Sequence, residues 1–291
     1  MLKHGLPVPR GFSLDASHYR SFVQPLAQRI LAALPCAERI ESIFLDAPVT
    51  TDTDATLARG IDDLVGVDRF AVRSSGKVFA NGCEQAEDDA NTSLAGQFES
   101  YLNVPRALVA DAVRRCWRSL YNQRSIDRFA ADARYISNSE MTVLIQEMVP
   151  AKACAVMMTA DPQGDGKIGA IEAAWGPCEV IVGGYANPDE ILFDRQTGTV
   201  LSTSIGSKMV RVRYGDFTAK TENLFRDATA LSERLTPALS DHEVSGLIKL
   251  GRNLEKIFGR PQDVEAVITF AGEIVITQSR PVTALNFLVA A

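Results

Sequence analysis

Four polar residues near the end of the chain, Asp263, Glu265, Gln278 and Arg280, have types and spacing that suit a magnesium-bound phosphate. They lie in two β-branched runs, VEAVITF and EIVITQS, which are separated by an Ala-Gly dipeptide and predict an antiparallel hairpin. With a two-residue loop, Glu265 pairs with Gln278 and Asp263 with Arg280, all on one face. Magnesium takes one or two carboxylates plus phosphate oxygens, and arginine binds phosphate through two parallel hydrogen bonds.

Two alternatives to this hairpin site stay open. A turn longer than two residues would shift the pairing and separate the four side chains. The same residue types are also common on solvent-exposed hairpins, where they form surface salt bridges and bind nothing. The hairpin alone therefore does not decide between a ligand site and a charged surface.

Segments with helical spacing and segments with strand-like spacing follow one another along the chain. These elements must position the hairpin. Apolar residues recur with helical spacing over 16–34, 55–65 and 107–131. Strand-like runs cover 142–149, 153–159, 168–175 and 190–194. Further expectations are a loop or edge segment over 1–12, a short strand at 70–73 running into a loop over 74–91, and two helices within 221–258. This mixture predicts an α+β fold of two lobes, an N-terminal lobe over 1–139 and a C-terminal lobe over 140–291.

Composition limits the class of protein. The 291 residues are 46% hydrophobic and 23% charged, which is typical of a globular chain that can bury two sizeable cores. A net charge of -6 argues against nucleic-acid binding, which needs a concentrated basic face. Five scattered cysteines without a CxxC pair indicate reduced thiols. Without a long apolar run or a signal core, we expect a cytoplasmic protein that binds neither membrane nor nucleic acid.

Four stretches resemble the nucleotide-binding domain shared by pyruvate phosphate dikinase, phosphoenolpyruvate synthase and the rifampin phosphotransferases. They are AVRSS (71–75) with SLAGQFESYLNV (93–104), VLIQEMVPAKACAVMMTADP (143–162), IEAAWGPCEVIVGGYANPDEILFDRQTG (171–198) and FGRPQDVEAVITFAGEIVITQSRPVTAL (258–285). Each is weak alone, but together they occur in the family's order and span nearly the whole chain. The resemblance implies an ATP-grasp fold, in which ATP lies between two α+β lobes, with ATP and Mg²⁺ as cofactors.

The resemblance also implies roles for charged residues. Glu265 and Gln278 match the family's metal-binding pair, and Asp263 lies where the family carries an acid next to the metal. Arg280 and Arg73 match the arginines that hold the ATP phosphates, and both are expected to be catalytic. A structural arginine at the end of a strand is the alternative for Arg73.

Three further positions match nucleotide contacts. Gly96 matches a point where the backbone approaches phosphate, because no Cβ intrudes there. Ser100 matches a neighbouring hydroxyl contact, although a turn or helix-cap serine fits its context almost as well. Gln146 matches the hinge at the adenine edge, where backbone groups do much of the binding, and the alternating VLIQEMV run equally suits a buried strand.

Some features of the family pattern are missing. The family begins with a GGKGANL-like stretch whose lysine contacts ATP phosphates, and no counterpart precedes GLPVPRGF (5–12). A start site placed too late is one explanation. The loop expected after Arg73 is longer than the family's and contains Lys77, which either replaces that lysine or is simply solvated. The family's dikinases also use a phosphohistidine domain, whose context matches none of His4, His18 and His242.

The leading hypothesis is an ATP-dependent phosphotransferase, of kinase type, that binds MgATP and passes a phosphoryl group onward. The acceptor is either a small molecule or a histidine on a separate partner protein. The alternative is a catalytically degenerate ATP-binding regulatory subunit, which the missing lysine favours. The intact set of charged residues on the hairpin favours the enzyme, because an unpaired charged cluster is costly to retain.

Overall fold

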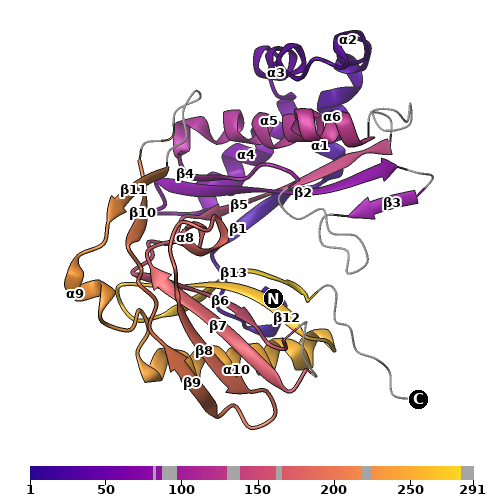
Figure 1. The fold of residues 1–291 in the computed structure, drawn as a ribbon. Coiled ribbons are helices and arrows are strands. Elements are labelled where there is room, and N and C mark those ends of the chain that lie inside the picture. The colour runs from indigo at the N-terminus through magenta and orange to yellow at the C-terminus, as the bar shows by residue number, and fades with distance from the viewer. Residues whose placement is uncertain are drawn as a thin grey trace, which may run out of the picture. The chain divides into compact units, whose positions relative to one another are not determined.

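A computed structural model describes residues 1–80, 83–86, 97–129, 138–161, 166–215, 217 and 224–282 (Figure 1). The chain divides into two compact units. The N-terminal unit contains Arg10–Met148 and Asp216–Asn223, and the C-terminal unit contains Met1–Pro9, Val149–Gly215 and Leu224–Ala291. This division differs from the expected one at 139/140, because strand β5 (Glu140–Glu147) pairs with two strands of the N-terminal unit and belongs to it.

The N-terminal unit is built on a five-stranded antiparallel sheet. Its strands run in the order β1-β5-β2-β3, and β4 pairs with β2. Besides β5, these strands are β1 (Gly11–Leu14), β2 (Arg69–Ala80), β3 (Cys83–Ala86) and β4 (Tyr101–Pro105). Strand β1 lies in the segment that the sequence indicated as a loop or edge, and it is an edge strand of the sheet.

Helices pack on one face of this sheet (Figure 1). They are α1 (Ala16–Val23), η2 (Gln24–Leu26), α2 (Ala27–Ala33), α3 (Ala37–Asp46), α4 (Thr51–Asp63), η3 (Arg106–Leu108), α5 (Val109–Arg118), η4 (Ser119–Tyr121) and α6 (Gln123–Phe129). Trp117 of α5 is fully buried, and its ring centre lies 5.0 Å from that of Phe22 on α1. Such aromatic pairs bury large apolar areas, so they tie α1 and α5 into one core.

The helix predicted over 107–131 is divided into several pieces in the structure. The break comes at Ser119, whose hydroxyl donates to the Cys116 carbonyl at 2.6 Å. Asn122 then accepts the Ser125 N–H at 2.8 Å, which is how a polar side chain starts a new helix. Local side-chain to backbone bonds therefore interrupt an otherwise continuous apolar stripe.

Strand β2 is much longer than the short strand predicted at 70–73. It pairs with β5 from Phe70 to Lys77, and its last residues pair with β3. Val78 is buried in the core, so the apolar alternation continues past Arg73. The predicted loop is therefore wrong over 74–80 and 83–86, and its remaining residues lie outside the described part of the chain.

The C-terminal unit contains a six-stranded antiparallel sheet in the order β13-β12-β6-β7-β8-β9. These strands are β6 (Ala153–Met158), β7 (Ile168–Trp175), β8 (Asp189–Asp194), β9 (Val200–Ser204), β12 (Gln262–Ile268) and β13 (Ile274–Pro281). The smaller elements of the unit are η1 (Leu2–His4), α8 (Glu179–Val182), α9 (Leu231–Arg234) and the paired strands β10 (Val210–Tyr214) and β11 (Leu224–Ala228). Two helices were predicted within 221–258, and α9 and α10 (Asp241–Phe258) both lie there; the first is only one turn long, because β11 occupies part of the predicted span.

The long helix α10 (Asp241–Phe258) covers one face of the six-stranded sheet (Figure 1). It begins with a capping box, in which Ser240 and Glu243 satisfy each other's backbone N–H groups. It ends at Gly259, which adopts a left-handed conformation with φ of 69°. Gly251 faces the sheet, where a Cβ would lie 2.7 Å from the Met157 side chain, so glycine allows close packing. Among the described helices, none has the length and apolarity to cross a membrane.

A buried ion pair holds the start of β8. Lys208 and Asp189 are each 1% exposed and form a salt bridge. The Asp189 carboxylate also accepts the N–H groups of Gly206 at 2.9 Å and Ala238 at 2.7 Å. The Asp189 carboxylate therefore joins three segments: the start of β8, residues 206–208 and the residues around Ala238.

We expect Lys208→Met to lower the free energy of unfolding by about 3–5 kcal/mol, because it leaves a buried carboxylate without its cation. Urea titration followed by circular dichroism measures this change. Lys249→Met, on the exposed side of α10, is the matched control and should change stability by less than about 0.5 kcal/mol. Equal stabilities of the two variants would show that the ion pair is not needed.

Candidate functional site

Hairpin β12–β13 begins at its turn in a different register from the one predicted. Ala266 pairs with Ile276 and Ile268 with Ile274, which is one residue out of step with a two-residue loop. The turn is wider than the predicted two residues. Within it, the Gly272 N–H donates to the Thr269 carbonyl at 2.9 Å. Continued unchanged, this register would place Glu265 opposite Thr277 instead of Gln278.

A β-bulge between Glu265 and Ala266 restores the predicted pairing. Thr277 is the extra residue, and its hydroxyl donates to the Glu265 carbonyl at 3.2 Å. Beyond the bulge Glu265 pairs with Gln278, and Asp263 pairs with Arg280. The predicted juxtaposition is therefore present, and the bulge, which sequence alternation did not reveal, produces it.

Asp263 holds the Arg280 guanidinium in place. The Nε and Nη2 atoms of Arg280 each lie 2.9 Å from the same oxygen, Oδ2 of Asp263. The Asp263 side chain is 14% exposed and that of Arg280 is 32% exposed. Because the guanidinium has five N–H groups, it keeps donors for a ligand while its orientation is fixed. Asp263 is therefore a positioning residue for Arg280.

The polar residues of the hairpin share the face of the six-stranded sheet opposite α10. Val264, Ala266 and Ile268 point into the core under α10, so the alternate residues Asp263 and Glu265 lie on the other face. At the turn end, α8 and β10 cover this face through a small cluster. That cluster contains Cys154, Ala174, Cys178, Val180, Val212 and Val267.

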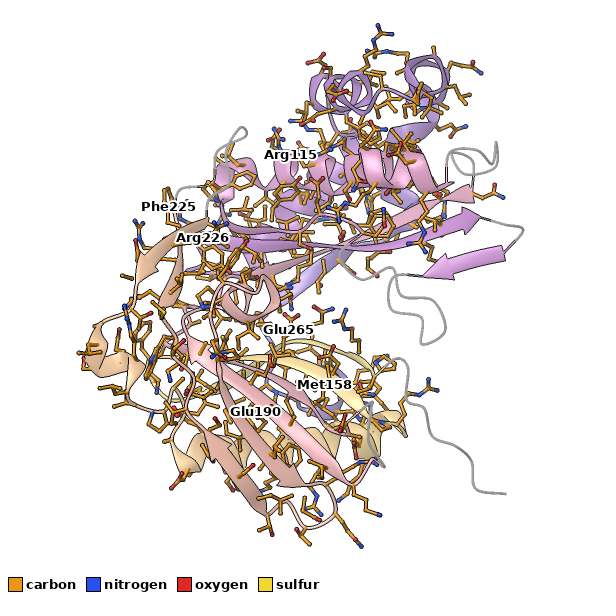
Figure 2. The ribbon with its side chains drawn as sticks, in the orientation of Figure 1. Arg115, Met158, Glu190, Phe225, Arg226 and Glu265 are labelled. Atoms are coloured by element: carbon orange, nitrogen blue, oxygen red, sulfur yellow. The ribbon has the colours of Figure 1, made fainter. Side chains whose placement is uncertain are left out.

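Two glutamates that we did not predict lie on the same face. Glu265 pairs across the sheet with Val156, Val156 with Glu172, and Glu172 with Glu190. Figure 2 shows Glu265 and Glu190 on β12 and β8, with Met158 on the intervening β6. Alternation places each glutamate on one side of its own strand, but the strand order that brings them together is a tertiary property that the sequence does not reveal.

The pKa of Glu172 is raised, first by its partial burial on the sheet and second by the charge of Glu190. The unfolded chain has neither effect, so it loses this proton at a lower pH than the folded chain does. Glu172 therefore contributes stability at acidic pH that is lost as the pH rises through the raised pKa.

We expect Glu172→Gln to raise Tm at pH 7 by about 1–3 °C, the effect of removing one repulsive cross-strand pair. The gain should vanish below about pH 4, where the native carboxyl is protonated in both states. Thermal unfolding followed between acidic and neutral pH tests this. Glu273→Gln, in the exposed hairpin turn, is the control and should show no such pH-dependent gain. A gain that persists undiminished at acidic pH would contradict the assignment.

In the N-terminal unit, Arg73 lies on the face of the sheet opposite the helices. It pairs with Leu144 of β5, while its neighbour Val72 points into the helical core. Its Nε atom is buried and has no hydrogen-bond partner among the described residues. A buried donor without a partner is costly, and an anionic ligand is one way to satisfy it.

Gln146 and Lys77 share that face with Arg73, because they occupy alternate positions in the same register. Gln146 is 8% exposed and lies on β5 between Gly11 and Ala71. Lys77 is exposed on β2, not in a loop, and its side chain makes no hydrogen bond or ion pair with the described residues. Strand β2 thus carries two cations, Arg73 and Lys77, four residues apart on the same face of the sheet.

Ser100 lies beside Arg73, and its hydroxyl accepts the Ser74 N–H at 3.4 Å. The segment that leads to it is anchored through Gln97, whose side chain donates to Ser125 at 3.0 Å and whose carbonyl accepts from Asn122 at 2.9 Å. Gly96 lies outside the described residues. The structure therefore places Arg73 and Gln146 in one sheet with Ser100 directly before its strand β4, and Glu265, Gln278 and Arg280 in another sheet.

The donor set on the hairpin suits a magnesium-bound polyphosphate. Glu265 and Gln278 offer oxygen ligands, which Mg²⁺ prefers, and Arg280 offers N–H donors to phosphate. The described residues contain no group of three or more His, Cys, Asp or Glu placed to hold a metal ion. Magnesium usually keeps waters and takes phosphate oxygens, so two protein ligands are enough.

An α+β chain of two units with this donor set is the arrangement expected of an ATP-grasp nucleotide-binding protein. Residues 1–288 match the family described as "Pyruvate phosphate dikinase, AMP/ATP-binding domain". The chain belongs to this family, which confirms the resemblance and the fold class drawn from the sequence.

Curated relatives agree with this membership. A probable phosphoenolpyruvate synthase of Methanothermobacter thermautotrophicus is 32% identical over 97% of this chain and 42% of its own length. A rifampicin phosphotransferase of Streptomyces sviceus is 32% identical over 97% of this chain and 32% of its own length. The chain thus spans less than half of these relatives. Among solved structures, the D-alanine-D-alanine ligase of Coxiella burnetii covers 98% of this chain and 46% of its own, at 10% identity and a TM-score of 0.38.

Proposed function

We propose that this chain binds MgATP and catalyses phosphoryl transfer from it. The observation that carries the proposal is the β12–β13 register, which places Glu265 opposite Gln278 and Asp263 opposite Arg280 on one face. Glu265 and Gln278 hold Mg²⁺, and Arg280 binds the phosphates. We expect the chain to act in the cytoplasm, where ATP is the ordinary phosphoryl donor.

Arg73 supplies the phosphate contact of the N-terminal unit, supported by its buried Nε, which has no hydrogen-bond partner in the described part of the chain. Gly96 and Ser100 provide the neighbouring backbone and hydroxyl contacts. Gln146 lies at the adenine edge together with the backbone of β5. Lys77, on the same face of the sheet as Arg73, adds a second cation near the phosphates.

Catalysis in this arrangement is positioning plus neutralisation of charge, as phosphoryl transfer generally requires. In transfer of the terminal group, an acceptor oxygen or nitrogen bonds to the γ-phosphorus as the bond to the β–γ bridging oxygen breaks. ADP leaves with the bonding electron pair, and the acceptor's proton passes to solvent. Arg73 and Arg280 stabilise the charge on the transferring oxygens, and a magnesium ion held by Glu265 and Gln278 would supply neutralising charge for the departing ADP.

The acceptor is a small molecule or a histidine on a separate protein. The names of the relatives, phosphoenolpyruvate synthase and rifampicin phosphotransferase, both favour a small-molecule acceptor. A regulatory subunit that binds ATP without turnover is the second candidate.

Phosphorus NMR of ATP incubated with the protein, Mg²⁺ and either pyruvate or rifampicin tests the proposal. We expect loss of the ATP signals and a new phosphoryl resonance. ADP as product indicates single transfer, and AMP indicates the dikinase type of reaction. ATP that binds but stays intact with both acceptors, and with a phosphohistidine domain from a relative, would support the regulatory subunit.

A further inference from the structure

A second candidate site lies on the α10 side of the six-stranded sheet. A cavity of about 660 Å³ opens in the C-terminal unit where β7 begins, β8 turns toward β9, and α10 leads into β12. It is separate from the face that carries Glu265, because α10 and that face are on opposite sides of the sheet. Its volume is in the range of cavities that hold small organic ligands.

Positive charge is concentrated in this cavity. Among the described residues, five cationic side chains line it, against the two carboxylates of Asp194 and Glu255, which is an excess of three positive charges. The whole chain has a net charge of -6, so the excess is local. The cations are Lys167, Arg195, Arg252, Lys256 and Arg260.

The position of α10 explains only part of this charge. Lys256, in the last turn of α10, is where a cation is favoured by the helix dipole. Lys167 directly precedes β7 and Arg195 directly follows β8, so the helix dipole does not account for their place in the cavity. Cations that converge from three segments repel one another, so their convergence is most simply explained by an anion that they bind.

The arginines are held in place by the protein. Arg195 donates from Nε to Glu255 at 3.0 Å and from Nη1 to the Gly166 carbonyl at 3.2 Å. Arg252 donates to the carbonyls of Gln196 at 2.9 Å and Thr197 at 3.3 Å. Both guanidinium groups keep further N–H donors in fixed directions, which lowers the entropy cost of binding.

Lys256 and Arg260 are available to contact a ligand. Lys256 and Arg260 are exposed, and neither side chain forms a hydrogen bond or an ion pair with the described residues. Glu255 is already occupied, because it accepts from Arg195 and from the Thr159 hydroxyl. The carboxylate therefore does not neutralise the free lysine and arginine.

We propose that this cavity binds a small molecule carrying two or more phosphate charges, such as a phosphate ester or diphosphate, at a site distinct from the proposed ATP site. Fixed arginines match the geometry of phosphate oxygens, and Lys256 and Arg260 add point charges. The cavity is too large for a bare phosphate ion, so the ligand has an organic part or a second phosphoryl group.

Calorimetric titration of the whole chain with inorganic pyrophosphate, without Mg²⁺ or ATP, tests the site. We expect binding that weakens about tenfold or more in the double variant Lys256→Ala/Arg260→Ala, since each direct contact to phosphate contributes a charge-assisted hydrogen bond. Both residues are exposed, so the variant should fold. Arg280→Ala should leave this binding unchanged, which separates the site from the proposed ATP site.

A control with the same change in net charge is Lys3→Ala/Lys249→Ala, in which both lysines are exposed elsewhere. It should bind pyrophosphate like the wild type. An equal loss in the control would mean diffuse attraction and overturn the site. The proposal would also fail if the wild type bound no pyrophosphate, or if Arg280→Ala abolished binding while Lys256→Ala/Arg260→Ala retained it. None of these outcomes depends on phosphoryl transfer.

Discussion

Replacing Glu265 with alanine should reduce turnover by about 10²-fold or more and weaken the binding of MgATP, while the protein stays folded. The metal supplies several kcal/mol of charge stabilisation, and each 1.36 kcal/mol corresponds to a factor of ten in rate. Binding of ATP without Mg²⁺ should change little. Calorimetry with and without Mg²⁺, together with the phosphorus NMR assay, measures both effects.

Two controls accompany this variant. Glu273→Ala, in the exposed turn of the same hairpin, removes the same charge away from the site and should behave like the wild type. Gln278→Ala should give a milder defect than Glu265→Ala, because a neutral amide binds Mg²⁺ less strongly than a carboxylate does. The same MgATP affinity and the same turnover in Glu265→Ala and the wild type would exclude Glu265 as a metal ligand.

The second large effect is expected for Arg280→Lys. Turnover should fall by about 10²-fold, whereas nucleotide affinity should fall much less, because the charge on the transferring group develops in the transition state. Lysine keeps the charge but loses the two-point contact with phosphate and the paired contact with Asp263. Steady-state kinetics, with affinity measured separately, distinguish the two effects.

Arg73→Ala should show the same pattern if the N-terminal unit contributes a phosphate contact. Arg20→Lys, at a surface salt bridge with Glu140, is the matched control and should keep full activity. If Arg280→Lys and Arg73→Ala both retain full turnover with an identified acceptor, ATP is not bound as proposed.

The hairpin site shows how far the sequence can predict such a structure. Alternation and the family resemblance both indicated the pairing of Glu265 with Gln278, and the structure contains it. The predicted cause was wrong, since a wider turn and a bulge at Thr277 replace the two-residue loop. Bulges depend on the fit between neighbouring strands, and a single strand's pattern does not encode that fit.

Other differences between the predicted and the observed structure also come from pairing between distant strands. Polar residues around Lys77 indicated a loop, but β5 and β3 provide hydrogen-bonding partners that extend β2 to Ala80. Glu172 and Glu190 were missed because they meet only after β7 and β8 pair. Local spacing predicted most of the elements, whereas contacts between distant strands set their ends and brought the additional site residues together.

The most direct test of the account is to find where the metal of bound ATP lies. Fe²⁺ can replace Mg²⁺ among oxygen ligands, and with ascorbate and peroxide it generates radicals that cleave the nearby backbone. Mass spectrometry of the fragments obtained with Fe²⁺ and ATP then locates the site. We predict ATP-dependent cleavage in β12 near Asp263 and Glu265 and in β13 near Gln278, suppressed by excess MgATP. ATP-dependent cleavage confined to other segments of the chain would contradict the assignment of the β12–β13 hairpin as the magnesium site.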